Sequence, residues 1–138
     1  MSLSNIVKKF PKDFIFGTAT SSYQIEGSSL GGCGESHWDS FSKMKNATHK
    51  FQNGSIACKH IENWNQDLDL IANAGFGAYR FSFSWPRILK DGRKEKNHQG
   101  ISFYDQLIDG MLERDIKPFS TLYHWDLPQT LAAKGGWT

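Results

Sequence analysis

Four side chains carry the chemistry that this sequence can offer: an amide, a guanidinium, an imidazole and an indole. They belong to Gln24, Arg80, His124 and Trp125. An amide both accepts and donates hydrogen bonds, as a neutral imidazole does, and neighbouring hydroxyl groups present both kinds of partner. An indole adds an apolar face on which a ring can stack. Together these groups suit a ligand that is dense in hydroxyls and has apolar ring faces, which is a sugar.

Each of these residues also has a purely structural explanation, which the sequence leaves open. Gln24 could cap a turn, His124 could be a structural histidine at the end of a strand, and Trp125 could fill the core. Arg80 either points into water or lies on an enclosed face of a sheet, where it would need a carboxylate partner. A carboxylate held ionised by such an arginine would have a lowered pKa, as a nucleophile requires.

Three carboxylates lie near these residues: Glu26, Asp39 and Asp126. Hydrolysis of a glycosidic bond uses two carboxyl groups, about 5–5.5 Å apart for retention or about 6.5–9.5 Å apart for inversion. Simpler roles account for all three, since Glu26 can brace its loop, Asp126 can cap a helix and Asp39 lies in a long loop. We therefore predict that none of them is catalytic.

The elements that would position these residues alternate along the chain. Residues 78–85 alternate strictly between aromatic and polar side chains, which predicts a strand that ends at Pro86. Apolar residues recur at three- and four-residue steps over 60–74 and 102–115, which predicts two amphipathic helices. The other predictions are strands over 14–20 and 118–125, a loop without regular structure over 27–57, and a helix opened by a capping pair of Asp126 and Gln129.

Strands that alternate with helices of this length indicate βαβ units and a parallel sheet. In such a sheet the carboxyl ends of the strands meet at one edge, so we expect Gln24, Arg80 and His124 to lie close together there. Three strands do not complete the sheet, and a closed (β/α)8 barrel takes roughly 250 residues. Residues 1–138 are therefore expected to be the opening part of a larger α/β domain.

Composition limits the remaining possibilities. With 138 residues, 38% of them hydrophobic, and a net charge of +2, the chain is at most one domain. It has neither the apolar run of about 20 residues that a membrane span needs nor the charge of a nucleic-acid-binding protein. Cys33 and Cys58 lack metal-binding spacing and are expected to be free thiols, with no metal and no other cofactor. Residues 1–9 lack the apolar core of a signal peptide, so we expect a cytoplasmic protein.

Four segments of the chain resemble family 1 of the glycoside hydrolases, the β-glucosidases. They are residues 14–27 (FIFGTATSSYQIEG), 36–41 (SHWDSF), 79–88 (YRFSFSWPRI) and 121–129 (TLYHWDLPQ), in the order and spacing of the family. The resemblance implies an α/β fold made of the N-terminal three β/α units of a (β/α)8 TIM barrel, within a single barrel domain to which residues 1–138 belong. It also implies retaining hydrolysis of terminal β-D-glucosides without a metal.

Carried over residue by residue, the resemblance implies that Gln24, His124 and Trp125 contact the sugar in the subsite of the cleaved residue. It implies that Arg80 is the partner of the catalytic nucleophile, and that β-linked glucosides or oligosaccharides are the substrates. The catalytic acid/base of the family lies in an Asn-Glu-Pro segment after the fourth strand, and the nucleophile lies in a Glu-Asn-Gly segment after the seventh. Neither segment occurs in residues 1–138.

The polypeptide alone is therefore expected to be inactive, with the missing remainder of the barrel as its partner. Two other functions stay open. One is a non-catalytic sugar-binding or interaction protein with the same fold. The other is a 6-phospho-β-glycosidase, although the Tyr-His-Trp-Asp-Leu-Pro segment at 123–128 looks more like the plain β-glucosidases.

Overall fold

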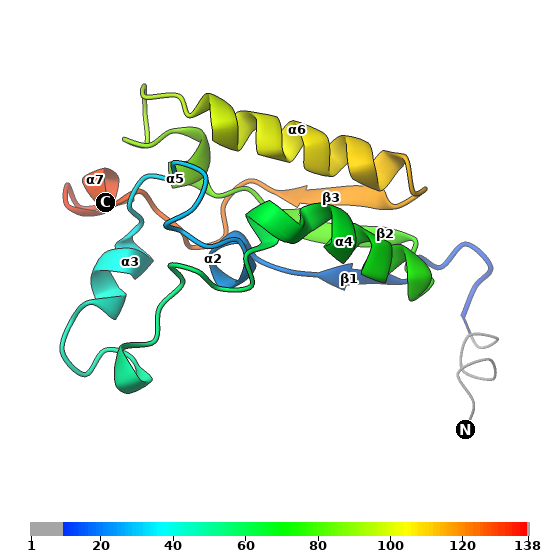
Figure 1. Ribbon diagram of the computed structural model, residues 1–138, viewed down its shortest axis with the longest axis horizontal. Helices are drawn as coiled ribbons and strands as arrows, with labels where there is room; N and C mark the ends of the chain where they lie inside the picture. The colour runs from blue at the N-terminus through cyan, green and yellow to red at the C-terminus, as the bar shows by residue number, and fades with distance from the viewer. Residues whose placement is uncertain (1–9, 138) are drawn as a thin grey trace.

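Three parallel strands form the centre of the fold in the order β1-β2-β3, and Figure 1 shows two long helices beside them. The structure is a computed structural model and describes residues 10–137, so the prediction for residues 1–9 lies outside the described residues. The strands are β1 (Gly17–Ala19), β2 (Ala78–Ser82) and β3 (Lys117–Thr121), and the long helices are α4 (His60–Asn73) and α6 (His98–Leu112). The predicted βαβ order and parallel sheet are confirmed.

The strands are shorter than predicted because each is limited by its neighbour. β2 begins at Ala78, opposite Gly17 and Lys117, so residues 14–16 have no partner strand and β1 cannot start at Phe14. β2 stops at Ser82 rather than at residue 85, because Ser84 begins the short helix α5 (Trp85–Ile88), which has a proline in its first turn. β3 then stops at Thr121, which is the register partner of Ser82.

The two long helices follow the periodicity of the sequence. α4 ends at Asn73, and Gly75 follows with a φ of 80°, the left-handed stop that its position predicts. α6 starts at His98, four residues before the predicted start of that helix at 102, because Asn97 already has extended backbone and opens it. The apolar faces of both helices pack against the sheet.

A single core lies between the sheet and these helices. Tyr79 and Phe81 point into it from β2, with exposed fractions of 1% and 2%. The other fully buried members come from α4, α6 and the segment before β3: Leu68, Phe103, Tyr104, Leu107, Met111 and Ile116. Because side chains alternate along a strand, Arg80 and Ser82 lie on the opposite face of the sheet.

The short helices gather at the carboxyl ends of the strands, where the polar residues of the sequence also lie (Figure 1). They are α2 (Ser22–Ile25), α3 (His37–Ser42), α5 and α7 (Gln129–Ala132), together with a 3-10 turn at His49–Phe51. The predicted loop over 27–57 is thus partly regular, because Ser36 and Asp39 form a reciprocal capping box that starts α3. Cys33 and Cys58 are free thiols, as predicted. Within residues 10–137, none of the helices has the length and apolarity that crossing a membrane requires.

Candidate functional site

A cleft of about 270 Å³ opens at the carboxyl ends of the strands. Its wall combines the segment after β1 with the segment after β3, which are about a hundred residues apart in the sequence. The cleft is lined by Ser21, Tyr23, Gln24, Trp38, His124 and Trp125. Three of the residues that the sequence singled out for sugar contacts therefore share one cleft, as the parallel topology predicts.

Gln24 reaches this cleft from the single turn of α2. Its backbone N–H donates to the carbonyl oxygen of Ser21 (3.2 Å), which holds the turn. The side chain is exposed, and among the described residues its amide makes no hydrogen bond. The turn-capping role that the sequence left open for Gln24 is therefore absent, and both functions of the amide are free for a ligand.

His124 and Trp125 lie in the tight turn that follows β3. Trp125 adopts a φ of 71°, in the left-handed region that bulky residues avoid, and its side chain is 67% exposed. A tryptophan so exposed does not fill the core of residues 10–137. The Nδ1 atom of His124 is buried and has no hydrogen-bond partner among these residues. The turn thus presents an indole face and an imidazole to the cleft.

Trp38 adds a second indole to the same cleft, whereas the sequence singled out only Trp125. Its ring lies between His37 (4.6 Å between ring centroids) and Phe41 (5.9 Å), and it faces Tyr23 at 6.4 Å. The capping box at the start of α3 fixes this helix and with it the ring. The spacing of Ser36 and Asp39 is the sequence signal that could have placed Trp38 on an ordered helix instead of in a loop.

Arg80 does not line the cleft, because it lies in the middle of β2 rather than at its end. Its Nε donates to Oγ1 of Thr121 on β3 (2.8 Å), and the side chain is half-buried. Within residues 10–137, no carboxylate lies within ion-pair distance of Arg80. Its guanidinium is therefore left with donors to spare on the sheet face opposite the helices.

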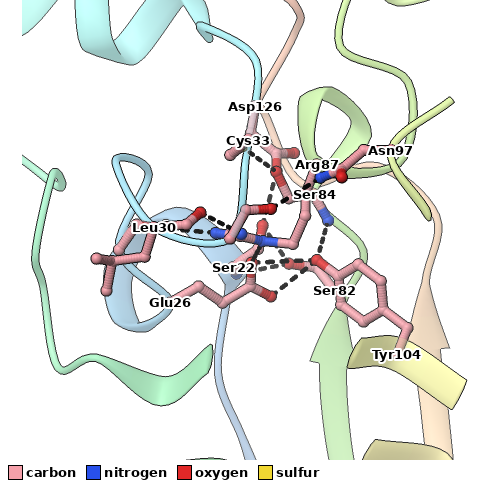
Figure 2. A network of polar contacts seen from close by, with 12 residues as sticks. Ser22, Glu26, Leu30, Cys33, Ser82, Ser84, Arg87, Asn97, Tyr104 and Asp126 are labelled. Carbon is pink, nitrogen blue, oxygen red and sulfur yellow. Dashed lines mark hydrogen bonds and ion pairs between the residues drawn. The ribbon is translucent and has the colours of Figure 1, made fainter. Parts of the chain in front are cut away.

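The buried arginine that does have a carboxylate partner is Arg87 of α5, which sequence reasoning missed. Its Nε donates to Oε2 of Glu26 (2.7 Å), while Nη1 and Nη2 donate to the carbonyl oxygens of Leu30 (2.8 Å) and Gly27 (3.0 Å). The hydroxyl of Tyr104 donates to the other oxygen of Glu26 (2.8 Å). Figure 2 shows how this network closes the loop after α2 against α5 and α6.

The network explains the ionisation of its members. Burial raises the pKa of Glu26, and the positive charge and hydrogen bond of Arg87 oppose that shift. Burial likewise raises the pKa of the nearby Cys33 thiol to about 11. Glu26 therefore braces its loop, as the sequence predicted, and it does not line the cleft.

Asp126 corrects one prediction. It does not cap α7, whose N-cap is Pro128 and which has no side-chain cap. Instead, its carboxylate accepts hydrogen bonds from Oγ of Ser22 (2.6 Å) and from the backbone N–H of His124 (3.4 Å). A cap and an acceptor for a distant serine look alike in sequence, because both need only a short polar side chain after a strand.

The fold and the cleft define a class of protein: the opening β/α units of a (β/α)8 barrel, with its functional groups at the carboxyl ends of the strands. Residues 6–138 match the profile described as Glycosyl hydrolase family 1, and the chain belongs to this family.

Relatives and solved structures agree on this family. A β-glucosidase from Agrobacterium sp. is 50% identical over 135 residues, which cover 97% of this chain and 29% of that enzyme. An aryl-phospho-β-D-glucosidase from Bacillus subtilis is 48% identical over 130 residues, covering 94% of this chain and 27% of that protein. The structure of a β-glucosidase from Thermotoga maritima in complex with castanospermine matches with a TM-score of 0.89 and 47% identity, covering 93% of this chain and 29% of the other.

The chain therefore spans less than a third of the length of each of these proteins. The predicted family and the predicted barrel units are confirmed. The roles of Gln24, Arg80, His124 and Trp125 are not tested by these similarities and stay predictions.

Proposed function

We propose that residues 1–138 form the N-terminal part of a single (β/α)8 domain that hydrolyses terminal β-D-glucosides with retention of configuration. The observation that carries this proposal is the cleft in which Gln24, His124 and Trp125 meet at the carboxyl ends of the strands. Its substrates are β-linked glucosides or oligosaccharides. The cytoplasmic location stays a prediction.

Each residue has a defined role in this proposal. The free amide of Gln24 accepts from one sugar hydroxyl and donates to its neighbour, and His124 adds a further hydrogen bond from its ring. The exposed indole of Trp125 stacks on the apolar face of the sugar ring. Arg80 has spare donors and a full positive charge, which would keep a nearby carboxylate ionised and so suited to act as the nucleophile.

In this proposal the nucleophile and the catalytic acid come from the remainder of the barrel. Glu26, Asp39 and Asp126 serve the fold, since all three are engaged in structural hydrogen bonds. Within the complete barrel these residues contact the sugar side of the substrate, and the polypeptide of 138 residues is inactive alone. The remainder of the barrel is its partner. The unpaired edges of β1 and β3, and the exposed ring of Phe119 (48%), fit a surface that further strands cover.

The experiment uses a hybrid barrel, in which residues 10–137 replace the matching segment of the Thermotoga maritima β-glucosidase. Hydrolysis of 4-nitrophenyl β-D-glucoside is measured for the hybrid barrel and for its Gln24→Ala and His124→Ala variants. We expect each variant to lose about 1–3 kcal/mol of transition-state stabilisation in kcat/KM, since each leaves one or more hydrogen bonds unmade.

The matched control is Gln106→Ala, because Gln106 is an exposed glutamine of α6 whose side-chain amide donates to Oγ of Ser102 (3.0 Å), away from the cleft. Its kcat/KM should equal that of the unchanged hybrid barrel. Equal activity of the Gln24→Ala, His124→Ala and Gln106→Ala variants would remove both residues from the sugar site. The chain of 138 residues, assayed alone, should show no turnover.

A second candidate is hydrolysis of 6-phospho-β-glucosides, which the similarity to the Bacillus subtilis aryl-phospho-β-D-glucosidase favours. The same hybrid barrel is assayed with 4-nitrophenyl β-D-glucoside 6-phosphate. A higher kcat/KM for the phosphorylated substrate would establish this alternative. Calorimetry of the 138-residue chain with glucose tests the remaining one, a non-catalytic sugar-binding protein, for which binding in the millimolar range is expected.

A further inference from the structure

A continuous chain of buried hydrogen bonds joins the carboxyl ends of all three strands. The backbone N–H of Ser22, after β1, donates to Oγ of Ser82, the last residue of β2 (2.8 Å). The Ser82 hydroxyl donates to Oγ of Ser22 (3.2 Å), and the Ser22 hydroxyl donates to the carboxylate of Asp126, after β3 (2.6 Å). Figure 2 shows Ser22 and Ser82 side by side beneath Asp126. We call these three residues the serine–aspartate tie.

The tie connects the two sides of the cleft. Ser22 is the first residue of α2, whose third residue is Gln24. Asp126 holds the other side, because its second oxygen accepts the N–H of His124. A displacement of Ser22 relative to Asp126 would therefore change the distance between the Gln24 amide and the turn that contains His124 and Trp125.

Stability alone does not explain a carboxylate at this position. Asp126 is 1% exposed, and among the described residues no lysine, arginine or histidine side chain forms an ion pair with it. A buried carboxylate without a cation is unfavourable unless its hydrogen bonds are needed. The turn that it holds contains a strained residue, Trp125, whose left-handed backbone persists only where its surroundings fix it.

We propose that Asp126 is a positioning residue for the sugar site: through Ser22 and the His124 amide it sets the separation of Gln24 from His124 and Trp125. This inference rests on the proposed function. It concerns a residue that neither lines the cleft nor reacts, and its effect is confined to how tightly the sugar is held.

The test measures inhibition by glucose in the hybrid barrel, because glucose occupies only the sugar side of the cleft. Asp126→Asn keeps the shape of the side chain but replaces one acceptor oxygen by an NH2 group, so one of the two hydrogen bonds is lost. Ser22→Ala removes the hydroxyl donor instead. We expect each variant to raise the inhibition constant of glucose about tenfold, since a small misplacement of binding groups weakens binding strongly.

The double variant Ser22→Ala/Asp126→Asn should lose less binding free energy than the sum of the two single variants, because Ser22 and Asp126 share one hydrogen bond. The matched control is Asp67→Asn, which removes a carboxylate bonded to His60 (2.6 Å) on α4 and should lower the unfolding temperature only. Inhibition constants for Asp126→Asn and Ser22→Ala that stay within about twofold of the unchanged hybrid barrel, as with Asp67→Asn, would overturn the proposal.

The Gln24→Ala variant separates this inference from the proposed function. If Gln24→Ala leaves glucose inhibition unchanged, the proposed function fails, and the tie is then judged by amide hydrogen exchange. Faster exchange at His124 and Trp125 in Asp126→Asn would support positioning, and unchanged exchange would refute it. If Asp126→Asn does not fold, Ser22→Ala carries both measurements.

Discussion

Replacing Arg87 by methionine should unfold this chain more readily than any change in the cleft. The guanidinium makes three hydrogen bonds, one to the Glu26 carboxylate and two to the carbonyl oxygens of Leu30 and Gly27. In Arg87→Met, Glu26 keeps only the hydroxyl of Tyr104. The two carbonyl groups each lose a hydrogen bond and keep only those from the N–H groups of Leu30 (3.1 Å, to Gly27) and Cys33 (3.5 Å, to Leu30). Both members of the ion pair are almost fully buried, with side-chain exposures of 1% and 5%, so water cannot replace the lost donor.

The structure sets the size of this effect. A hydrogen bond to a charged group contributes about 1.5–3 kcal/mol, and each of the two hydrogen bonds that the carbonyl groups lose contributes about 1 kcal/mol. The total of about 4 kcal/mol agrees with the range of about 3–5 kcal/mol expected when one partner of a buried ion pair is removed. We therefore expect the free energy of unfolding to fall by about 4 kcal/mol in Arg87→Met.

Urea unfolding of the 138-residue chain, followed by circular dichroism, measures this loss, and the midpoint of thermal unfolding of the hybrid barrel repeats it in a closed domain. A second substitution tests the reasoning. Adding Glu26→Gln removes the stranded charge, so the double variant should regain part of the stability that Arg87→Met loses. A double variant less stable than Arg87→Met, or a loss of less than about 1 kcal/mol in Arg87→Met alone, would show that the ion pair is not a major source of stability.

Three further predictions concern single sites. Burial raises the pKa of Cys33 to about 11, so iodoacetamide at pH 8 should alkylate the exposed Cys58 and leave Cys33 unmodified, as peptide mass spectrometry would show. Hydrogen bonds from three backbone N–H groups lower the pKa of Asp91 to about 2. The contribution of these hydrogen bonds to the stability of the folded chain is therefore complete above the ordinary pKa near 3.8, and it is lost as the pH falls toward 2. The unfolding temperature of Asp91→Asn should fall less steeply over that pH interval than that of the unchanged chain. A Cβ atom at Gly100 would clash with a backbone oxygen of α5, so Gly100→Ala should destabilise the fold by about 1–3 kcal/mol in chemical denaturation, whereas Gly77→Ala, which meets open space, should not.

Each of these has a contrary result. Equal labelling of both cysteines in the native chain would show that the loop around Cys33 opens readily. Parallel pH profiles of the unchanged chain and Asp91→Asn would show that the hydrogen bonds to Asp91 do not persist in solution. A gain in stability for Gly100→Ala, which helix propensity alone would give, would mean that α6 packs less closely on α5 than the structure has it.

The long helices and the central strand could be predicted because their patterns are local. The apolar spacing of α4 and α6 and the alternation in β2 depend on residues a few positions apart, and the structure confirms them. The ends of the strands could not be predicted, because they depend on register. Nothing in residues 14–16 indicates that β2 starts too late to pair with them.

Contacts between polar side chains were even harder to predict from the sequence than the ends of the strands. Sequence reasoning sought a carboxylate partner for Arg80, whose place in an alternating strand was evident, and overlooked Arg87 in the next turn. The partner of Arg87 is 61 residues away, and that of Asp126 is 104 residues away. Such contacts follow from the arrangement of strand ends, so only the grouping of Gln24, His124 and Trp125 at one edge was within reach.

The order of the strands in the sheet has a consequence for biosynthesis. β1, β2 and β3 lie next to one another in the order in which the ribosome makes them. Each new strand can therefore pair with a strand that is already synthesised. The helix that connects the two strands can then pack against the pair. Segments of this kind can acquire structure while the polypeptide is still emerging, without waiting for distant parts of the chain.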